Sequence, residues 1–433
     1  MTNIAQIKRP VWAKTAPHTW NVVPIRSVLK ERKEKNTKLE ETNILSVMKD
    51  VGVIRYEDKG NVGNKSSDRP EAYKIVRPND LVLNSMNLSI GSVGISRESG
   101  VTSSVYIIYR VIAGLADADF FNYLFQTRAF QRHLASYGRG IMELREAVKE
   151  RDIRNQPVVL PPLETQKKIA AFLDEKTKAI DALVEKKEKL IALLREKRQS
   201  LITQVVTKGL DPKVKMKPSG VEWIGSVPNS WEKVPLKFLF SYQSGGVWGD
   251  EARNDDHDVI CVRVADFDFD NFSANSNDFT YRNIPDIKKD LVLDNHSILL
   301  EKSGGGDQQP VGRAVRYLRT EKATCSNFIQ KLQVKKTQNP EFIVLLLSML
   351  YFSGVTLKVI KKTTGIQNLD LGAFLRTDVF LPPTDQQDAI VRSVVAESMK
   401  VSQGVRQLKG QIERLKEYRA ALIYAAVTGK IKI

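Results

Sequence analysis

The sequence reads LPPLETQ over residues 160–166 and LPPTDQQ over residues 381–387, and these two stretches decide the fold. They stand 221 residues apart, and the sequences that follow them align without a gap. At that spacing the residues Ile191, Leu194, Glu196, Arg198, Leu201, Ile202, Val206 and Thr207 recur as Ile412, Leu415, Glu417, Arg419, Leu422, Ile423, Val427 and Thr428. This agreement indicates a duplicated segment, with a large unlike segment in front of each copy.

Each copy predicts one long helix with an apolar stripe at heptad spacing, which is the pattern of a coiled-coil seam. The expected seam residues are Leu173, Ile180, Leu194 and Leu201 in the first copy and Val394, Val401, Leu408, Leu415 and Leu422 in the second. We favour an antiparallel pair within one chain over a homodimer, because one molecule can then bury both stripes. Thr384 and Gln387 also predict a capping box at the start of the second helix.

The two segments in front of the helices predict mixed α+β domains. Period-two runs over 105–109 and 259–264 predict strands, and the apolar stretches 120–130 and 342–352 predict helices. The predicted fold class is α+β. It comprises two globular mixed α/β domains separated by two long helices, which form an antiparallel intramolecular coiled coil with a pseudo-twofold internal repeat.

The chain of 433 residues carries a formal net charge of +17, which favours a polyanionic partner, most often nucleic acid. It has two cysteines, too few for a disulfide framework or a cysteine zinc cluster, and its four histidines lack metal-ligand spacing. The N-terminus has no signal-peptide core, and the apolar run 342–352 is about half of a membrane span. We therefore expect a cytoplasmic protein without a metal site or membrane association.

The ordered set of motifs resembles the specificity subunit of type I restriction-modification systems. Its markers are the two Leu-Pro-Pro stretches, each followed by a glutamine and an isoleucine, and the linker 220–231, which reads GVEWIGSVPNSW. The resemblance covers essentially the whole chain. It implies a first target-recognition domain (1–159), a central long helix (160–210), a second target-recognition domain (211–380) and a C-terminal long helix (381–433).

The resemblance also implies a function. Each target-recognition domain would read one half of a bipartite, asymmetric sequence in double-stranded DNA. The helices would space the two halves and recruit two methyltransferase subunits and up to two restriction subunits. The chain itself would have no catalytic centre and no cofactor, since S-adenosylmethionine, ATP and Mg would be bound by the partner subunits. Two alternatives stay open: the specificity subunit of a methylation-only system, and a coiled-coil scaffold that binds nucleic acid.

Loops in both segments carry the side chains that DNA binding requires, which are cations for phosphates and planar hydrogen-bonding groups for base edges. The candidates are Arg97, Tyr137 and Arg139, with the loop 61–69, in the first segment and Lys302, Gln308, Arg313, Lys361, Lys362, Thr363, Gln367 and Asn368 in the second. The repeated Arg198 and Arg419 are interpreted as serving helix pairing or partner docking. The phosphate-loop motif and the Pro-Pro motif of base methyltransferases are absent, so no catalytic residue is predicted.

Overall fold

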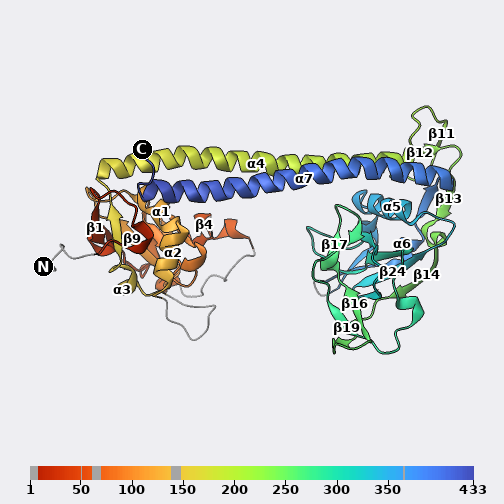
Figure 1. The fold of residues 1–433 in the computed structure, drawn as a ribbon, viewed down its shortest axis with the longest axis horizontal. Helices are drawn as coiled ribbons and strands as arrows, with labels where there is room; N and C mark the ends of the chain where they lie inside the picture. The colour runs from red at the N-terminus through yellow and green to blue at the C-terminus, as the bar shows by residue number, and fades with distance from the viewer. Residues whose placement is uncertain (1–7, 50, 61–69, 138–147, 364–365) are drawn as a thin grey trace. The chain divides into compact units, whose positions relative to one another are not determined.

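The computed structural model describes residues 8–49, 51–60, 70–137, 148–363 and 366–433 (Figure 1). The chain forms two compact units, of which the first comprises residues 1–186 with 411–433 and the second comprises residues 187–410. Each unit contains one globular domain together with part of each long helix. The four predicted segments instead keep each helix whole, and their boundaries remain a prediction.

The globular domain of the first unit is a mixed α/β domain built from small sheets. Its main sheet has the strand order β2-β9-β6-β7, and the pairs β1-β10, β3-β4 and β5-β8 accompany it. The helices are α1 (Ala118–Gln126), α2 (Arg128–Ala135) and α3 (Glu150–Ile153). The strands are β1 (Asn21–Pro24), β2 (Leu29–Glu31), β3 (Leu45–Met48), β4 (Gly52–Arg55), β5 (Lys74–Val76), β6 (Leu81–Leu83), β7 (Val93–Ile95), β8 (Gly100–Thr102), β9 (Ile107–Val111) and β10 (Pro157–Leu160).

The helix predicted over 120–130 is divided in the structure. Thr127 has an extended backbone, and its hydroxyl donates to the carbonyl of Leu124 at 2.8 Å. This bond ends α1, and α2 begins at the next residue. The single-helix prediction was wrong at this point, because the apolar pattern runs across the break.

The globular domain of the second unit has a six-stranded sheet of order β14-β24-β20-β22-β18-β17, a four-stranded sheet β15-β19-β16-β23 and a three-stranded sheet β21-β26-β25, together with the pairs β11-β12 and β13-β27. Its helices are α5 (Pro340–Phe352) and α6 (Leu371–Leu375). The strands are β11 (Met216–Pro218), β12 (Ser226–Pro228), β13 (Glu232–Pro235), β14 (Phe240–Gly245), β15 (Asp250–Glu251), β16 (Asp258–Val262), β17 (Phe267–Asp268), β18 (Ser273–Ala274), β19 (Tyr281–Asn283), β20 (Ser297–Glu301), β21 (Ser303–Gly304), β22 (Ala314–Arg316), β23 (Ala323–Cys325), β24 (Ile329–Val334), β25 (Ile360–Thr363), β26 (Ile366–Leu369) and β27 (Asp378–Leu381).

The longest apolar run of the sequence forms α5, whose residues from Phe342 to Leu350 are all buried. The helix packs in the core of the second domain with the apolar residues of β20 and β24. The prediction of a helix over 342–352 is therefore confirmed. Within the described residues, no helix has both the length and the apolarity that crossing a membrane requires.

Both domains join the long helices through the same two-stranded arrangement. β1 pairs antiparallel with β10, and β13 pairs antiparallel with β27. In these pairs Asn21 lies opposite Leu160, and Glu232 lies opposite Leu381. Each Leu-Pro-Pro stretch leads directly from its strand into a long helix, α4 (Leu163–Lys208) or α7 (Thr384–Val427). The duplication read from the sequence thus includes the strands that precede the helices.

The long helices α4 and α7 pair antiparallel within the chain. In the first unit, Ile169 and Leu173 near the start of α4 share a core with Ile423 and Val427 near the end of α7. In the second unit the opposite ends meet, because residues 202–206 of α4 share a core with residues 390–394 of α7. The predicted seam residues Leu173, Ile180, Leu194, Leu201, Val394, Val401, Leu408, Leu415 and Leu422 are all buried or half-buried. These contacts confirm the antiparallel intramolecular coiled coil.

A buried glutamine ties the first domain to the start of α4. Gln166 is fully buried, and its Oε1 accepts a hydrogen bond from the backbone N–H of Asp117 at 2.9 Å. Its Nε2 donates to the carbonyls of Pro161 at 2.9 Å and Leu115 at 3.1 Å. Asp117 is the N-cap of α1, where its side chain accepts from the N–H of Phe120. We call this arrangement the glutamine bridge.

The second domain has the same glutamine bridge. Gln387 is 1% exposed, and its Oε1 accepts from the backbone N–H of Asn339, the N-cap of α5, at 3.1 Å. Its Nε2 donates to the carbonyl of Pro382 at 3.0 Å and to Oε1 of Gln338 at 2.9 Å. The capping box predicted for Thr384 and Gln387 is therefore corrected, because the glutamine side chain serves the bridge instead.

Each long helix ends at a glycine that lies against a repeated tryptophan. Gly209 has φ +75°, and a Cβ there would lie 3.4 Å from the ring of Trp231. Gly429 has φ +67°, and a Cβ there would lie 2.9 Å from the ring of Trp20. Positive φ values favour glycine at the end of a helix. The tryptophans near the start of both domains thus close the ends of α4 and α7.

Candidate nucleic-acid interface

In the second domain, the two loops that the sequence singles out lie in one small sheet. β21 pairs with β26, which pairs with β25. The hydroxyl of Ser303 donates to Oδ1 of Asn368 at 2.6 Å, and the N–H of Leu369 donates to the carbonyl of Lys302 at 2.8 Å. The ammonium of Lys302 is also engaged, since it donates to Gln330 Oε1 at 3.2 Å. The two sequence segments therefore form one surface.

Lys361 and Lys362 extend from β25 into solvent, with side chains 71% and 66% exposed. The ammonium of Lys361 lies 2.7 Å from Asp370 Oδ2, and that of Lys362 lies 2.7 Å from Asp307 Oδ1. These lysine hydrogen bonds lower the pKa values of both carboxyl groups. Exposed ion pairs contribute little stability, so either lysine can exchange its carboxylate for a phosphate at small cost. Gln308, next to Asp307, is also exposed.

Arg313 and Gln367 lie inside the domain. The side chain of Arg313 is 14% exposed and forms a bidentate pair with Glu301, at 2.8 and 3.2 Å. Gln367 is 5% exposed, and its Oε1 accepts from the backbone N–H of Val311 at 3.3 Å. This is a correction to the predicted set, because both side chains are largely buried and bind groups of the same domain. The side chain of Thr363 lies outside the described residues.

A cavity of about 550 Å³ adjoins this sheet. Its lining includes the exposed rings of Trp248 and Phe328 and the side chain of Arg263. One wall is fixed by close backbone approach, since a Cβ on Gly246 would lie 2.1 Å from the carbonyl oxygen of Ser326. Aromatic rings offer apolar contact to a base, and Arg263, whose Nε and Nη2 donate to Asp266 at 3.4 and 3.1 Å, places a positive charge beside them. This cavity could not be predicted from the sequence, because its walls come from distant segments.

The first domain exposes Arg97 and Tyr137. The Arg97 side chain is 60% exposed and pairs with Asp119 in the first turn of α1. Tyr137 is 41% exposed, and its ring lies edge-on to His133 with centroids 5.6 Å apart. Burial lowers the pKa of His133, which favours a neutral ring. Arg139 and the loop 61–69 lie outside the described residues.

The described residues contain neither a cysteine poised as a thiolate nor a cluster of metal ligands. Burial raises the pKa of the Cys261 thiol to about 11 and that of the Cys325 thiol to about 12, so neither forms a thiolate near neutral pH. Among the residues that the structure describes, no group of three His, Cys, Asp or Glu side chains could hold a metal ion. The exposed lysines and the aromatic cavity are features of a binding surface.

The comparisons with known proteins agree with this geometry. Residues 17–192 and 228–395 match the family model for the type I restriction modification DNA specificity domain. A solved structure of a type I R-M system, described for its complex assembly and conformational transition, is similar to this chain with a TM-score of 0.67 and 16% identity, and the match covers 96% of this chain and 100% of that chain.

Two further solved structures are also similar to this chain. The HsdS subunit from Thermoanaerobacter tengcongensis has a TM-score of 0.47 and 17% identity, covering 96% of this chain and 98% of that chain. The S subunit of the type-I restriction-modification system from M. genitalium has a TM-score of 0.37 and 14% identity, covering 95% and 96%. No curated protein sequence matches the chain. The structure with a TM-score of 0.67 has the same fold as this chain.

Proposed function

Since the chain belongs to the type I restriction-modification DNA specificity family, we propose that its two globular domains each read one half of a bipartite, asymmetric DNA sequence. The observation that carries this proposal is the duplicated attachment under two unlike domains. Both domains enter the long helices through a two-stranded pair in the same register and through a glutamine bridge. Two unlike domains that are attached to the helices in the same way are expected to recognise two unlike DNA sequences.

In the second domain, the proposed division of labour follows from exposure and chemistry. Lys361 and Lys362 bind phosphates, because they are exposed cations whose ion pairs with Asp370 and Asp307 can be exchanged at small cost. The cavity beside Trp248 and Phe328 receives a base edge or a thymine methyl group, because it combines apolar rings with the side chain of Arg263. In the first domain, Arg97 and Tyr137 are the described candidates for the same roles.

The chain works within a type I restriction-modification system, whose general partners are DNA and the methyltransferase and restriction subunits. We propose a complex with two methyltransferase subunits and up to two restriction subunits, in the cytoplasm. In this proposal the chain is non-catalytic, and S-adenosylmethionine, ATP and Mg are bound by the partners. The paired helices set the spacing between the two half-sites and present a docking surface to the methyltransferases.

A base-resolution methylation map of cells that contain the methyltransferase partner, with and without this chain, tests the proposal. The expected result is one split, asymmetric methylated motif that disappears with the chain. Replacing Trp248 and Phe328 with alanine is expected to relax one half of that motif and leave the other half unchanged. Phe238→Ala is the matched control, since Phe238 is an exposed ring of the same unit outside the cavity. A motif that persists without the chain would contradict the proposal.

A further inference from the structure

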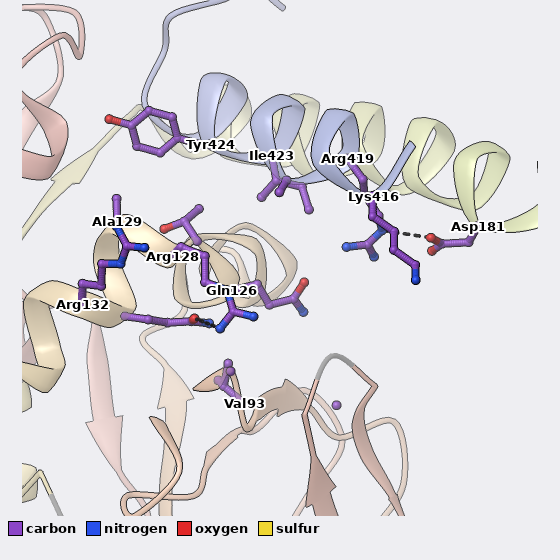
Figure 2. A pocket seen from close by; sticks show the side chains of 15 residues that line it. Val93, Gln126, Arg128, Ala129, Arg132, Asp181, Lys416, Arg419, Ile423 and Tyr424 are labelled. Atoms are coloured by element: carbon purple, nitrogen blue, oxygen red, sulfur yellow. Dashed lines mark hydrogen bonds and ion pairs between the residues drawn. The ribbon is translucent and has the colours of Figure 1, made fainter. Parts of the chain in front are cut away.

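The first unit contains a cavity of about 850 Å³ between its globular domain and the long helices. Figure 2 shows Lys416 and Arg419 extending from α7 towards this cavity, with Arg128 and Arg132 reaching it from α2. Asp181 of α4 is the one acidic residue in the lining, against four basic residues. The remaining lining residues are Gly52, Gly91, Val93, Gln126, Thr127, Ala129, Gln131, Ala420, Ile423 and Tyr424.

The internal repeat shows what an arginine at this helix position binds. Arg198, which corresponds to Arg419, is 7% exposed in the second unit. Its guanidinium donates to the backbone carbonyl of Asp270 at 2.7 Å and to the carboxylate of the same residue at 3.1 Å. Arg195 adds a bond to that carboxylate at 2.9 Å. In the second unit, an acidic turn of the domain therefore fills the space in front of the arginine.

This contact also corrects the partner-docking interpretation of Arg198. The arginine is occupied by the β17–β18 turn of its own domain and stacks over Phe272 at 5.5 Å. Burial acts to raise the pKa of Asp270, but the bonds from Arg195 and Arg198 hold it below its ordinary value. The ionised carboxylate of Asp270 thus anchors this turn on α4. Arg198 is therefore not available to a partner subunit.

Arg419 has a different environment in the first unit. Its Nε donates to Oδ1 of Asp181 at 3.0 Å, and the Asp181 side chain is 56% exposed. The guanidinium faces the cavity, where Lys416 lies on the same helix and the two arginines of α2 lie on the opposite wall (Figure 2). Cations that converge on a partly enclosed cavity favour an anion there, because the low dielectric strengthens their attraction. Because Arg198 binds a carboxylate at the equivalent position of the repeat, the expected ligand in this cavity is an oxyanion.

We propose that this cavity binds a phosphate of the DNA backbone, so that α7 contacts the duplex beside the first recognition domain. The inference rests on the proposed function, which brings a duplex to this domain. A single carboxylate needs only the arginines of one helix, as Asp270 does, whereas this cavity has cations on two walls. Duplex DNA presents closely spaced charges, about one per 1.7 Å of helix axis, and can satisfy both walls together. Such a contact adds affinity and register but reads no base.

The test is the salt dependence of DNA binding by the complex of the full chain with its methyltransferase partner. The variant combines Arg132→Gln and Lys416→Gln, because both side chains are exposed and lie outside the heptad stripe. The matched control combines Lys409→Gln and Arg414→Gln, which are exposed on α7, lie outside the cavity lining and remove the same charge. The slope of log K against log salt is expected to fall by about 1–2 in the variant, on specific and scrambled DNA alike, and the methylated motif stays unchanged.

Three outcomes would overturn the inference. The slope could match that of the control. Methyltransferase assembly could fail while the slope holds, which would indicate a carboxylate of the partner in the cavity. The melting temperature could fall with an unchanged slope, which would indicate an acidic group from a part of this chain that the structure does not describe. If the unaltered complex itself fails to distinguish specific from scrambled DNA, it is the proposed function that fails.

Discussion

Replacing Gln166 with leucine tests whether the glutamine bridge holds the first domain on the helix. Leucine fills similar space but leaves the Asp117 N–H and the Pro161 carbonyl without their partner. Each buried polar group left unsatisfied costs about 1–3 kcal/mol, so the junction should lose roughly 2–6 kcal/mol. At 1.4 kcal/mol per factor of ten, local opening becomes about 30- to 20,000-fold more frequent.

Hydrogen–deuterium exchange read by mass spectrometry measures this opening peptide by peptide. Amides of α1 and of the first turns of α4 are expected to exchange faster in the Gln166→Leu variant, and those of α5 are expected to keep their rates. Gln387→Leu should give the reverse pattern. Gln204→Leu, at an exposed position of α4, is the control that should change neither domain. Unchanged exchange in α1, or an equal increase in both domains, would refute the role of the bridge.

Three further predictions concern the ion pair, the lysines and the helix length. Because the pKa of Asp270 is lowered in the folded protein, its ionised form stabilises the second unit at neutral pH, and this contribution is lost below about pH 4. Urea unfolding should therefore find the Asp270→Asn variant about 1–3 kcal/mol less stable at pH 7, with a smaller difference at pH 3.5. Combining Lys361→Gln with Lys362→Gln should lower the salt slope of DNA binding by about 1–2, with stability unchanged. Inserting one heptad after Lys189 and one after Gly410 lengthens both helices by about 10 Å and should lengthen the unread spacer in a methylation map by about three base pairs.

Each of these predictions has an outcome that contradicts it. A pH-independent stability difference would show that the charge of Asp270 is not what anchors its turn. Combining Lys335→Gln with Lys336→Gln, both exposed, is the control for the lysine variant. An equal change in the salt slope of this control would show that the lysines of β25 have no special role. A heptad insertion that altered the bases within either half-site would mean that the helices do more than set spacing.

The helices and the repeat could be predicted from the sequence because their signals are local. Heptad spacing needs only a stretch of one helix, and the offset of 221 residues exposed the duplication directly. The break between α1 and α2 could not be found in this way, because Thr127 sits inside an apolar pattern that continues across it. The role of Gln166 was also missed, since its partners near Asp117 lie far away in the sequence.

The candidate site residues also differ in whether their signal is local or depends on contacts with distant parts of the sequence. The lysines of β25 follow from composition alone, because exposed cations need no precise partner. Arg313 and Gln367 are equally suitable residue types for binding DNA, but their side chains face inward. This orientation follows from their bonds to Glu301 and Val311, which the sequence does not show. The two cavities depend on segments that meet in three dimensions, such as the glycine-rich stretch before Trp248 and the turn that carries Phe328.

The core of the first domain includes Ile423, Ala426 and Val427 from the far end of the chain. The hydroxyl of Tyr424 also donates to the carbonyl of Trp12, 412 positions earlier in the sequence. During synthesis at about 5–20 residues per second, the ribosome needs on the order of tens of seconds to pass from β10 to these residues. Through that interval the first domain has its own strands but lacks the apolar side chains that complete its core. Of the two domains, the one that is synthesised earlier therefore completes its core only after the other has been made.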